Sequence, residues 1–193
     1  MKPLTKNRLK LVFIAILFSM PVITAWTVFK NPQMLEGVKT KNHGELIIPA
    51  VPSELTGFVI SGDSIDMERL KGRWVLMHID FDGQCTSACK KSVLRTHQLN
   101  ILLNKDSRRF RRIYLTKSNV QETTLLFKDE SLNVYSWGEE QINRLNQSVK
   151  GLVDGDMLLI DPLGNIMMKY KQDADPYGIQ KDLKLLFKTS QIG

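Results

Sequence analysis

Apolar residues divide the chain into a hydrophobic N-terminal segment, an irregular middle segment and a longer patterned region. Residues 11–29 carry no charged side chain, and about 20 apolar residues are enough for a helix to cross a bilayer. Residues 30–56 contain three prolines and no helical period. We therefore expect a basic tail over residues 1–10, a transmembrane anchor over 11–29, a linker over 30–56 and one domain over 57–193.

The flanking charges predict the orientation of the anchor. Four basic residues precede the apolar stretch, and only Lys30 follows it closely. The positive-inside rule then places the N-terminus in the cytoplasm and the domain outside. In a bacterium this means the inner membrane, with the domain facing the periplasm. A cleaved signal peptide is the alternative, but Ile23 stands where a cleavage site needs a small residue.

The pattern after residue 56 alternates short apolar runs with segments of helical spacing. Strands are expected at residues 58–60, 73–81, 112–116, 132–137, 156–160 and 165–170. Helices are expected at residues 66–70 (a single turn), 86–103, 139–149 and 175–187, and residues 122–129 remain ambiguous. This order predicts an α/β fold: a thioredoxin-like mixed sheet flanked by helices and preceded by one transmembrane helix.

The net charge of +7 comes from 27 basic and 20 acidic residues, and it is concentrated in two places. The N-terminal tail contributes four positive charges. Residues 105–112 contribute five more and one negative charge, which leaves the rest of the chain close to neutral. This distribution argues against a nucleic-acid-binding protein, which would spread basic residues along a surface. Residues 105–112 suit a solvated loop and strand start, or a patch for anionic lipid or an acidic partner.

The two cysteines, Cys85 and Cys89, are the residues most indicative of chemistry. They follow a predicted buried strand and open a predicted helix, where unpaired N–H groups and the helix dipole favour a thiolate. We expect Cys85 to be the more exposed nucleophile and Cys89 its partly buried partner. The pair suits a redox disulfide or a soft metal ion such as Cu(I). A static disulfide, or two idle thiols, is the structural alternative.

Three histidines are candidates for further ligands or bases. His43 falls in the linker, where we expect it to be solvated. His97 lies about two helical turns beyond Cys89, too far to share a metal ion with it. His78 lies on the buried strand and suits a hydrogen-bonded core residue. A strand rises about 3.3 Å per residue, so we do not expect His78 to reach either sulfur.

Several motifs resemble the Sco/SenC family. They are the C-x-x-x-C pair, Ile-Asp-Pro-Leu-Gly at residues 160–164 and Asp-Ala-Asp-Pro at residues 173–176. Residues 42–47 and 190–193 resemble a Sco-like subgroup of bacterial cytochrome-oxidase-associated membrane proteins. The resemblance implies a thioredoxin fold that helps to insert copper into cytochrome c oxidase, with Cys85 and Cys89 as the copper-binding residues.

The chain departs from this family at three points. No proline lies between Cys85 and Cys89, and residues 151–158 lack the histidine that completes the family's copper site. No proline lies between Pro52 and Pro162, where thioredoxins place a cis-proline beside their cysteines. The missing histidine bears on copper binding and leaves thiol chemistry intact.

We therefore expect a membrane-anchored accessory protein for cytochrome oxidase assembly, using Cys85 and Cys89 for thiol redox or Cu(I) handling. Its partner would be a cytochrome c oxidase subunit or another assembly factor. A general thiol-disulfide oxidoreductase is one alternative. A non-catalytic assembly factor that keeps the fold as a binding platform is another.

Overall fold

The computed structural model describes residues 3–31, 41–53, 59–60, 63–64, 70, 72–190 and 192. It contains two compact units, Met1–Lys41 and Asn42–Gly193, which are described separately below.

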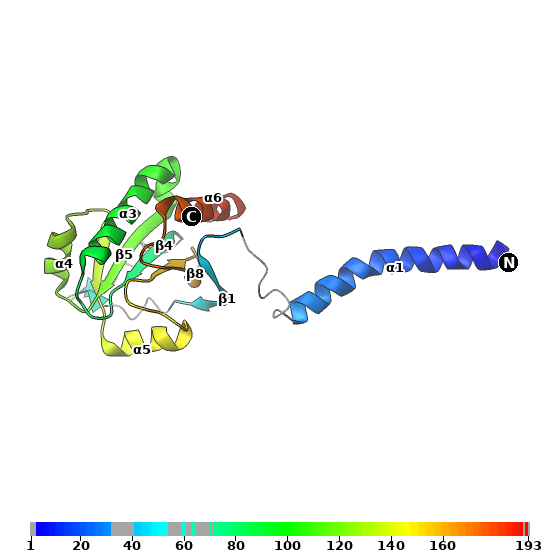
Figure 1. The fold of residues 1–193 in the computed structure, drawn as a ribbon, viewed down its shortest axis with the longest axis horizontal. Helices are drawn as coiled ribbons and strands as arrows, with labels where there is room; N and C mark the ends of the chain where they lie inside the picture. Colours follow the sequence, from blue (N-terminus) through cyan, green and yellow to red (C-terminus); the bar gives the residue numbers. More distant parts are fainter. Residues whose placement is uncertain are drawn as a thin grey trace. The chain divides into compact units, whose positions relative to one another are not determined.

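The first unit is the helix α1, Pro3–Lys30 (Figure 1). Its segment Asn7–Lys30 is long and apolar enough to cross a membrane, and it contains the predicted anchor. The few polar side chains bond within the helix: the Ser19 hydroxyl donates to the carbonyl of Ala15 at 2.7 Å. Satisfying polar groups internally is what a helix in lipid requires.

The second unit is built on a mixed six-stranded sheet in the order β1-β8-β7-β4-β5-β6. The strands are β1 Glu45–Pro52, β4 Trp74–Ile79, β5 Phe110–Thr116, β6 Leu132–Ser136, β7 Met157–Ile160 and β8 Asn165–Tyr170. Strands β4, β5 and β6 are parallel, with β6 at one edge, whereas β7, β8 and β1 continue the sheet as antiparallel neighbours. A separate hairpin joins β2 (Val59–Ile60) to β3 (Asp63–Ser64).

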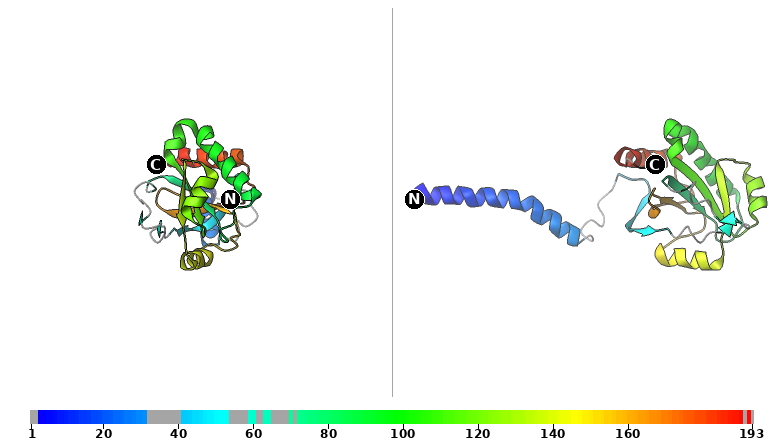
Figure 2. Two further views of the ribbon diagram at one scale, coloured as in Figure 1. Left: turned by 90° about the vertical axis from the view of Figure 1, so that its left-hand side faces the viewer. Right: turned by 180° about the vertical axis from the view of Figure 1, so that it is seen from behind.

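Helices cover both faces of this sheet (Figures 1 and 2). They are α3 Ser87–Leu103, η3 Asn104–Arg109, α4 Val120–Phe127, α5 Glu139–Ser148 and α6 Pro176–Thr189. One core lies under α3 and α6, where Leu99 and Leu183 pack against Leu76 of β4. A second core lies under α5, where Ile142 packs with Val75 and other residues of the opposite face, and a smaller cluster holds Cys89 with Tyr114. Every residue of β4 is buried, which explains its continuous apolar sequence.

The sequence predictions agree with most of these elements, and α6 begins as predicted. The Asp175 carboxylate caps it by accepting from the Tyr177 amide at 3.2 Å, and Pro176 occupies the first turn. The ambiguous segment 122–129 is largely the helix α4. The predicted helical turn at 66–70 lies outside the described residues except for Leu70.

The linker prediction differs from the structure over Glu45–Pro52, which forms the edge strand β1 paired with β8. Prolines at positions 49 and 52 suggested irregular chain, but an edge strand tolerates proline because one side of it needs no ladder hydrogen bonds. The buried Asp182 carboxylate holds the entry to β1. It accepts from the backbone amides of His43 and Gly44 at 2.9 and 3.0 Å.

Candidate functional site

Cys85 and Cys89 form a disulfide at the junction between β4 and α3, with their Cα atoms 5.2 Å apart. Cys85 ends the loop that follows β4 and is partly exposed, whereas Cys89 lies in the first turn of α3 and is 8% exposed. The Thr86 hydroxyl caps this helix and accepts from the Cys89 amide at 3.5 Å. The predicted difference in exposure between the two sulfurs is confirmed.

Asp80 organises the loop that leads to Cys85. This buried carboxylate accepts from the Gly83 amide at 2.6 Å, from the Thr116 hydroxyl at 2.7 Å and from the Tyr114 hydroxyl at 3.0 Å. Gly83 has a positive φ of 76°, and a Cβ at this position would lie 2.7 Å from Ser118 Oγ, so this turn favours glycine. The Asp80 carboxylate therefore helps to anchor the loop to β5.

Tyr114 connects this carboxylate to the buried sulfur. Its hydroxyl oxygen lies 3.1 Å from Cys89 Sγ and donates to Asp80. Burial, followed by the charge of Asp80, raises the pKa of the Tyr114 phenol above its ordinary value. The ring is held edge-on by Phe127, with 4.9 Å between the ring centroids. The phenol is therefore a fixed neutral bridge between Cys89 and Asp80.

Carboxylates gather beside the disulfide and oppose thiolate formation. Oxygens of Asp80, Asp82 and Asp154 all lie within 4.8 Å of one another. Burial raises the pKa of Asp154, and the charges of Asp82 and Asp80 raise it further. In the reduced protein these charges act against the helix N-terminus, which favours a thiolate.

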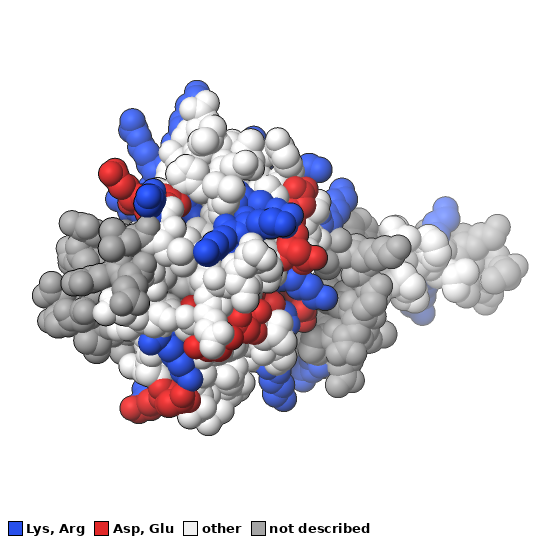
Figure 3. Space-filling view, turned by 60° about the vertical axis from the view of Figure 1, so that its left-hand side comes forward, with Lys and Arg blue, Asp and Glu red and all other residues white. Residues whose placement is uncertain are grey.

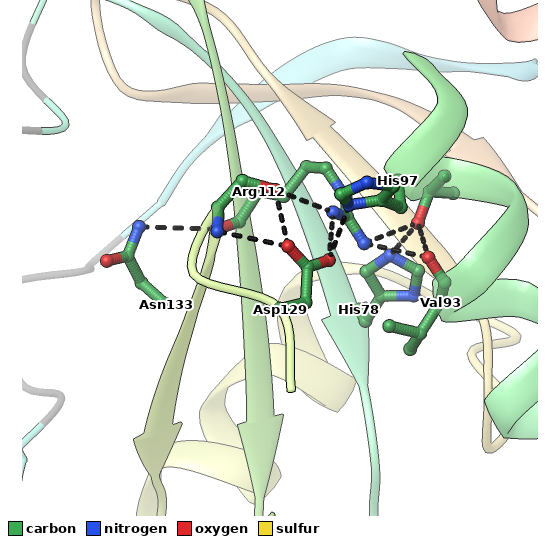
Figure 4. Close-up of polar contacts among 8 residues, drawn as sticks. His78, Val93, His97, Arg112, Asp129 and Asn133 are labelled. Carbon is green, nitrogen blue, oxygen red and sulfur yellow. Dashed lines mark hydrogen bonds and ion pairs between the residues drawn. The ribbon is translucent and has the colours of Figure 1, made fainter. Parts of the chain in front are cut away.

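Arg112 occupies the centre of a second polar cluster, between the sheet and α3 (Figure 4). Its side chain is fully buried and donates to the Asp129 carboxylate at 2.7 Å, to Ser131 Oγ at 3.2 Å, to the Val93 carbonyl at 2.8 Å and to Thr96 Oγ1 at 3.1 Å. The sequence analysis treated residues 105–112 as solvated, which is wrong for Arg112. β5 begins at Phe110, earlier than predicted, and carries Arg112 into the interior.

His78 belongs to this cluster and is a hydrogen-bonded core residue, as predicted. Its Nε2 lies 2.9 Å from Thr96 Oγ1 (Figure 4), and Thr96 donates its own hydrogen to the Val93 carbonyl at 3.0 Å. Nε2 must therefore carry the proton, which leaves the lone pair on Nδ1. Burial, reinforced by Arg112, lowers the pKa of His78 to about 3, so the ring is neutral. His78 and Cys89 both line a cavity of about 10 Å³, room for one water molecule.

The other two histidines lie away from the disulfide. His97 Nδ1 approaches the Asp129 carboxylate at 3.0 Å, beside Arg112 (Figure 4). His43 Nδ1 lies 3.1 Å from Asp182 Oδ1, so His43 is partnered, although its side chain remains 44% exposed. The expectation of a freely solvated His43 is therefore wrong in part, because β1 carries this segment onto α6.

The sequence analysis did not single out Tyr114 or Arg112. The signal was present: a charged residue beside or within a run of buried apolar residues needs a partner. Position alone, however, did not reveal which partner each would meet.

The family model described as transmembrane-like, thioredoxin-like, C-terminal domain matches residues 74–190, more than half of the chain. The chain belongs to this family. The matched part of this thioredoxin-like protein includes β4, the Cys85–Cys89 disulfide, the central sheet and all the helices from α3 to α6. A search of curated protein sequences finds no match.

Solved Sco structures share the fold. Apo Sco1 from Thermus thermophilus has a TM-score of 0.60 and 16% identity, covering 75% of this chain and 96% of that one. BsSco, described as a member of the Sco family of cytochrome c oxidase assembly proteins with a disulfide switch, has a TM-score of 0.54 and 15% identity, covering 72% and 96%. Copper-bound ScoI from Arabidopsis thaliana has a TM-score of 0.53 and 13% identity, covering 78% and 100%. The predicted Sco-like, thioredoxin-like fold is confirmed.

Proposed function

We propose that this protein is a membrane-anchored accessory factor for cytochrome c oxidase assembly whose reduced Cys85 and Cys89 exchange with a partner disulfide. The observation that carries the proposal is the unequal burial of the two sulfurs at a helix N-terminus, with Tyr114 and Asp80 behind the buried one. BsSco, a Sco-family cytochrome c oxidase assembly protein with a disulfide switch, shares this fold and supports the biological setting.

The exchange balances as a two-electron reaction. In the reduced protein, the Cys85 thiolate attacks a partner disulfide, forms a mixed disulfide and releases one partner thiolate. The Cys89 thiolate then attacks Cys85 Sγ, closes the internal disulfide and releases the second partner thiolate. The partner gains two electrons and this protein loses two, so a dithiol reductant must restore it before the next cycle.

The buried position of Cys89 requires a route for its proton. In the reduced state the Cys89 thiol can donate to the Tyr114 oxygen, and the phenol can donate to Asp80. A proton that leaves Cys89 therefore reaches the Asp80 carboxylate in two short transfers. We assign Tyr114 and Asp80 to this transfer during the resolving step.

Cu(I) is the second candidate, as cargo. Two thiolates suit a soft monovalent ion, and the copper-bound Arabidopsis ScoI shares this fold. The imidazole of His78 lines a cavity with Cys89; its Nε2 bonds Thr96, so only Nδ1 could meet a metal ion. We propose that any Cu(I) is held by the two sulfurs, and His78→Gln tests whether Nδ1 adds a third ligand.

The location and partner follow from the same proposal. We infer an inner-membrane protein with one membrane span, whose domain faces the periplasm and acts on a cytochrome c oxidase subunit or another assembly factor. The basic N-terminal tail and the apolar helix α1 support this orientation.

Trapping of the mixed disulfide tests the exchange. The full chain in non-ionic detergent is reduced and mixed with glutathione disulfide, and adducts are counted by mass spectrometry. Cys89→Ser should accumulate a stable adduct at Cys85, because the resolving thiol is missing. Cys85→Ser should form adducts much more slowly, because Cys89 is buried. Equal adduct formation by both variants would contradict the assigned roles.

The same variants test the partner. Cys89→Ser expressed in cells should retain a covalent partner that a reducing agent releases, and the proposal requires an oxidase subunit or assembly factor. If the double variant Cys85→Ser/Cys89→Ser supports normal oxidase assembly, the protein is a binding platform and the redox proposal fails. Trapping of unrelated periplasmic proteins would instead favour a general oxidoreductase.

A further inference from the structure

A polar hollow of about 520 Å³ lies at the end of the sheet away from the disulfide. Its polar lining includes Arg73, Asn100, Ser107, Arg111, Ser131 and Asn133. Arg73 and Arg111 lie where β4 and β5 begin, whereas Cys85 follows the other end of β4. A six-residue strand spans about 20 Å, so this hollow is separate from the cysteine site.

The two arginines place positive charge in this hollow, and little negative charge lies beside them. Both are only partly exposed, and each donates to backbone carbonyls. Arg73 Nη1 lies 2.5 Å from the Arg108 carbonyl, and Arg111 Nη1 lies 2.7 Å from the Phe110 carbonyl and 3.5 Å from that of Arg108. Among the described residues, neither forms an ion pair with a carboxylate. Burial lowers the pKa of Arg111, and the charge of Arg73 lowers it further.

Neutral donors stand beside these guanidinium groups. Asn100 and Ser107 are partly buried and line the same hollow, as does the amide of Asn133. The carboxylate of Glu130 also lines it but remains exposed, so two cations face one anion. Repulsion between neighbouring guanidinium groups is relieved most directly by an anion that both can hydrogen-bond.

On the face drawn in Figure 3, basic and acidic side chains are interspersed. A broad basic surface for long polyanions is not seen there, in contrast to the concentrated charge of the hollow. The volume suits a small ligand, because ligand pockets usually measure about 300–1,000 Å³.

We propose that Arg73 and Arg111 form a binding site for a phosphate-type oxyanion, either a free phosphate compound or the headgroup of an anionic phospholipid. Guanidinium groups hold phosphate through paired charge-assisted hydrogen bonds, and the amides and hydroxyl of the hollow complete its coordination. This inference does not depend on the function proposed for the cysteines.

Calorimetric titration tests the site with inorganic phosphate as the probe. The full chain is held in non-ionic detergent at constant ionic strength, with chloride as the reference anion. We expect saturable one-to-one binding that Arg73→Gln and Arg111→Gln each weaken at least about tenfold, because each change removes charge-assisted hydrogen bonds to the anion. The matched control, Lys181→Gln/Lys184→Gln on the exposed side of α6, removes two positive charges and should leave the affinity unchanged.

Circular dichroism checks that each variant is folded. Arg111→Lys keeps the positive charge and tests whether the paired hydrogen bonds of the guanidinium group are required. Arg111→Lys should also weaken binding, because an ammonium group cannot bond phosphate in a paired fashion. Absence of saturable phosphate binding, or equal binding by the wild type and both glutamine variants, would overturn the proposal.

Nanodiscs distinguish the two sources of phosphate. In discs of neutral phosphatidylcholine, the site should bind added phosphate as it does in detergent. If discs containing phosphatidylglycerol abolish this binding in the wild type, and added soluble glycerol 1-phosphate competes for the site in neutral discs, the ligand is a lipid headgroup. If binding persists in phosphatidylglycerol discs, the ligand is a free anion.

Discussion

The buried pair of Arg112 and Asp129 makes a quantitative prediction about stability. Asp129→Asn removes the carboxylate that faces Arg112 at 2.7 Å and leaves a cation with no exposed surface. Leaving a buried charge unpaired typically costs about 3–5 kcal/mol. We therefore expect Asp129→Asn to lower the free energy of unfolding by about that amount.

The reverse change should cost less. Arg112→Met leaves Asp129 with the Ser131 hydroxyl at 2.7 Å, the Ser131 amide at 3.0 Å and His97 Nδ1 at 3.0 Å. Methionine also fills much of the space that the arginine stem occupied. We expect a loss of about 2 kcal/mol for Arg112→Met, and the double variant should be no less stable than Asp129→Asn alone.

The pH dependence provides an independent check. Burial alone would raise the pKa of Asp129, but hydrogen bonds from Ser131 and Arg112 and the charge of Arg112 lower it to about 2 from 3.8. A lowered pKa stabilises the folded state above the pKa of the unfolded chain, and this stabilisation disappears as the pH falls toward 2. After allowance for solvent screening, the ionisation contributes about 1–2 kcal/mol. Asp129→Asn should lack it, so the wild type should approach the variant in acid.

Urea unfolding of the full chain in non-ionic detergent, followed by tryptophan fluorescence, measures all four proteins of this double-mutant cycle. Trp74 and Trp137 are both buried and report on the domain. Losses that add within about 0.5 kcal/mol would refute the reasoning, as would a wild type whose advantage over Asp129→Asn is unchanged between pH 6 and pH 3.

Four further changes test other parts of the structure. Tyr114→Phe should slow closure of the Cys85–Cys89 disulfide at least about tenfold, because it removes the proton path. Stopped-flow fluorescence of the reduced protein mixed with glutathione disulfide measures this rate, and an unchanged rate would exclude the path. Asp182→Leu should cost about 2–3 kcal/mol by releasing residues 43–44, and faster hydrogen exchange at Gly44 would report the release. Competition titration should show that Cu(I) binding is lost in Cys85→Ser and kept in His78→Gln; loss in His78→Gln would identify a third ligand. A reporter fused after residue 193 should be active only outside the cytoplasm, and a cytoplasmically active fusion would reverse the proposed topology.

The sequence predicts the sheet and most of its helices because their signals are local. β4 reads as a continuous apolar run, and Asp175-Pro176 is a strong helix start. β1 could not be predicted in this way, because its place depends on pairing with β8, more than a hundred residues later. The hydrogen bonds from residues 43 and 44 to Asp182 are equally remote in sequence.

The candidate site was likewise predictable only where its signals are local in sequence. The two cysteines and their unequal exposure follow from their position at a strand-to-helix junction, which the sequence displays. The contact between Cys89 and Tyr114 does not, because it depends on the parallel register that sets β5 beside β4. The burial of Arg112 escaped prediction because its partners come from α3 and from the segment after α4.

The edge position of β1 has a consequence for crowding. A protein confined to the plane of a membrane meets copies of itself far more often than one free in solution, and an open sheet edge invites a second chain to add a strand. Pro49 and Pro52 carry no amide hydrogen, and the register of β1 shifts between Leu46 and Val51. The outer side of β1 is therefore a poor template for an added strand, and strand addition at this edge should be suppressed even when the protein is abundant.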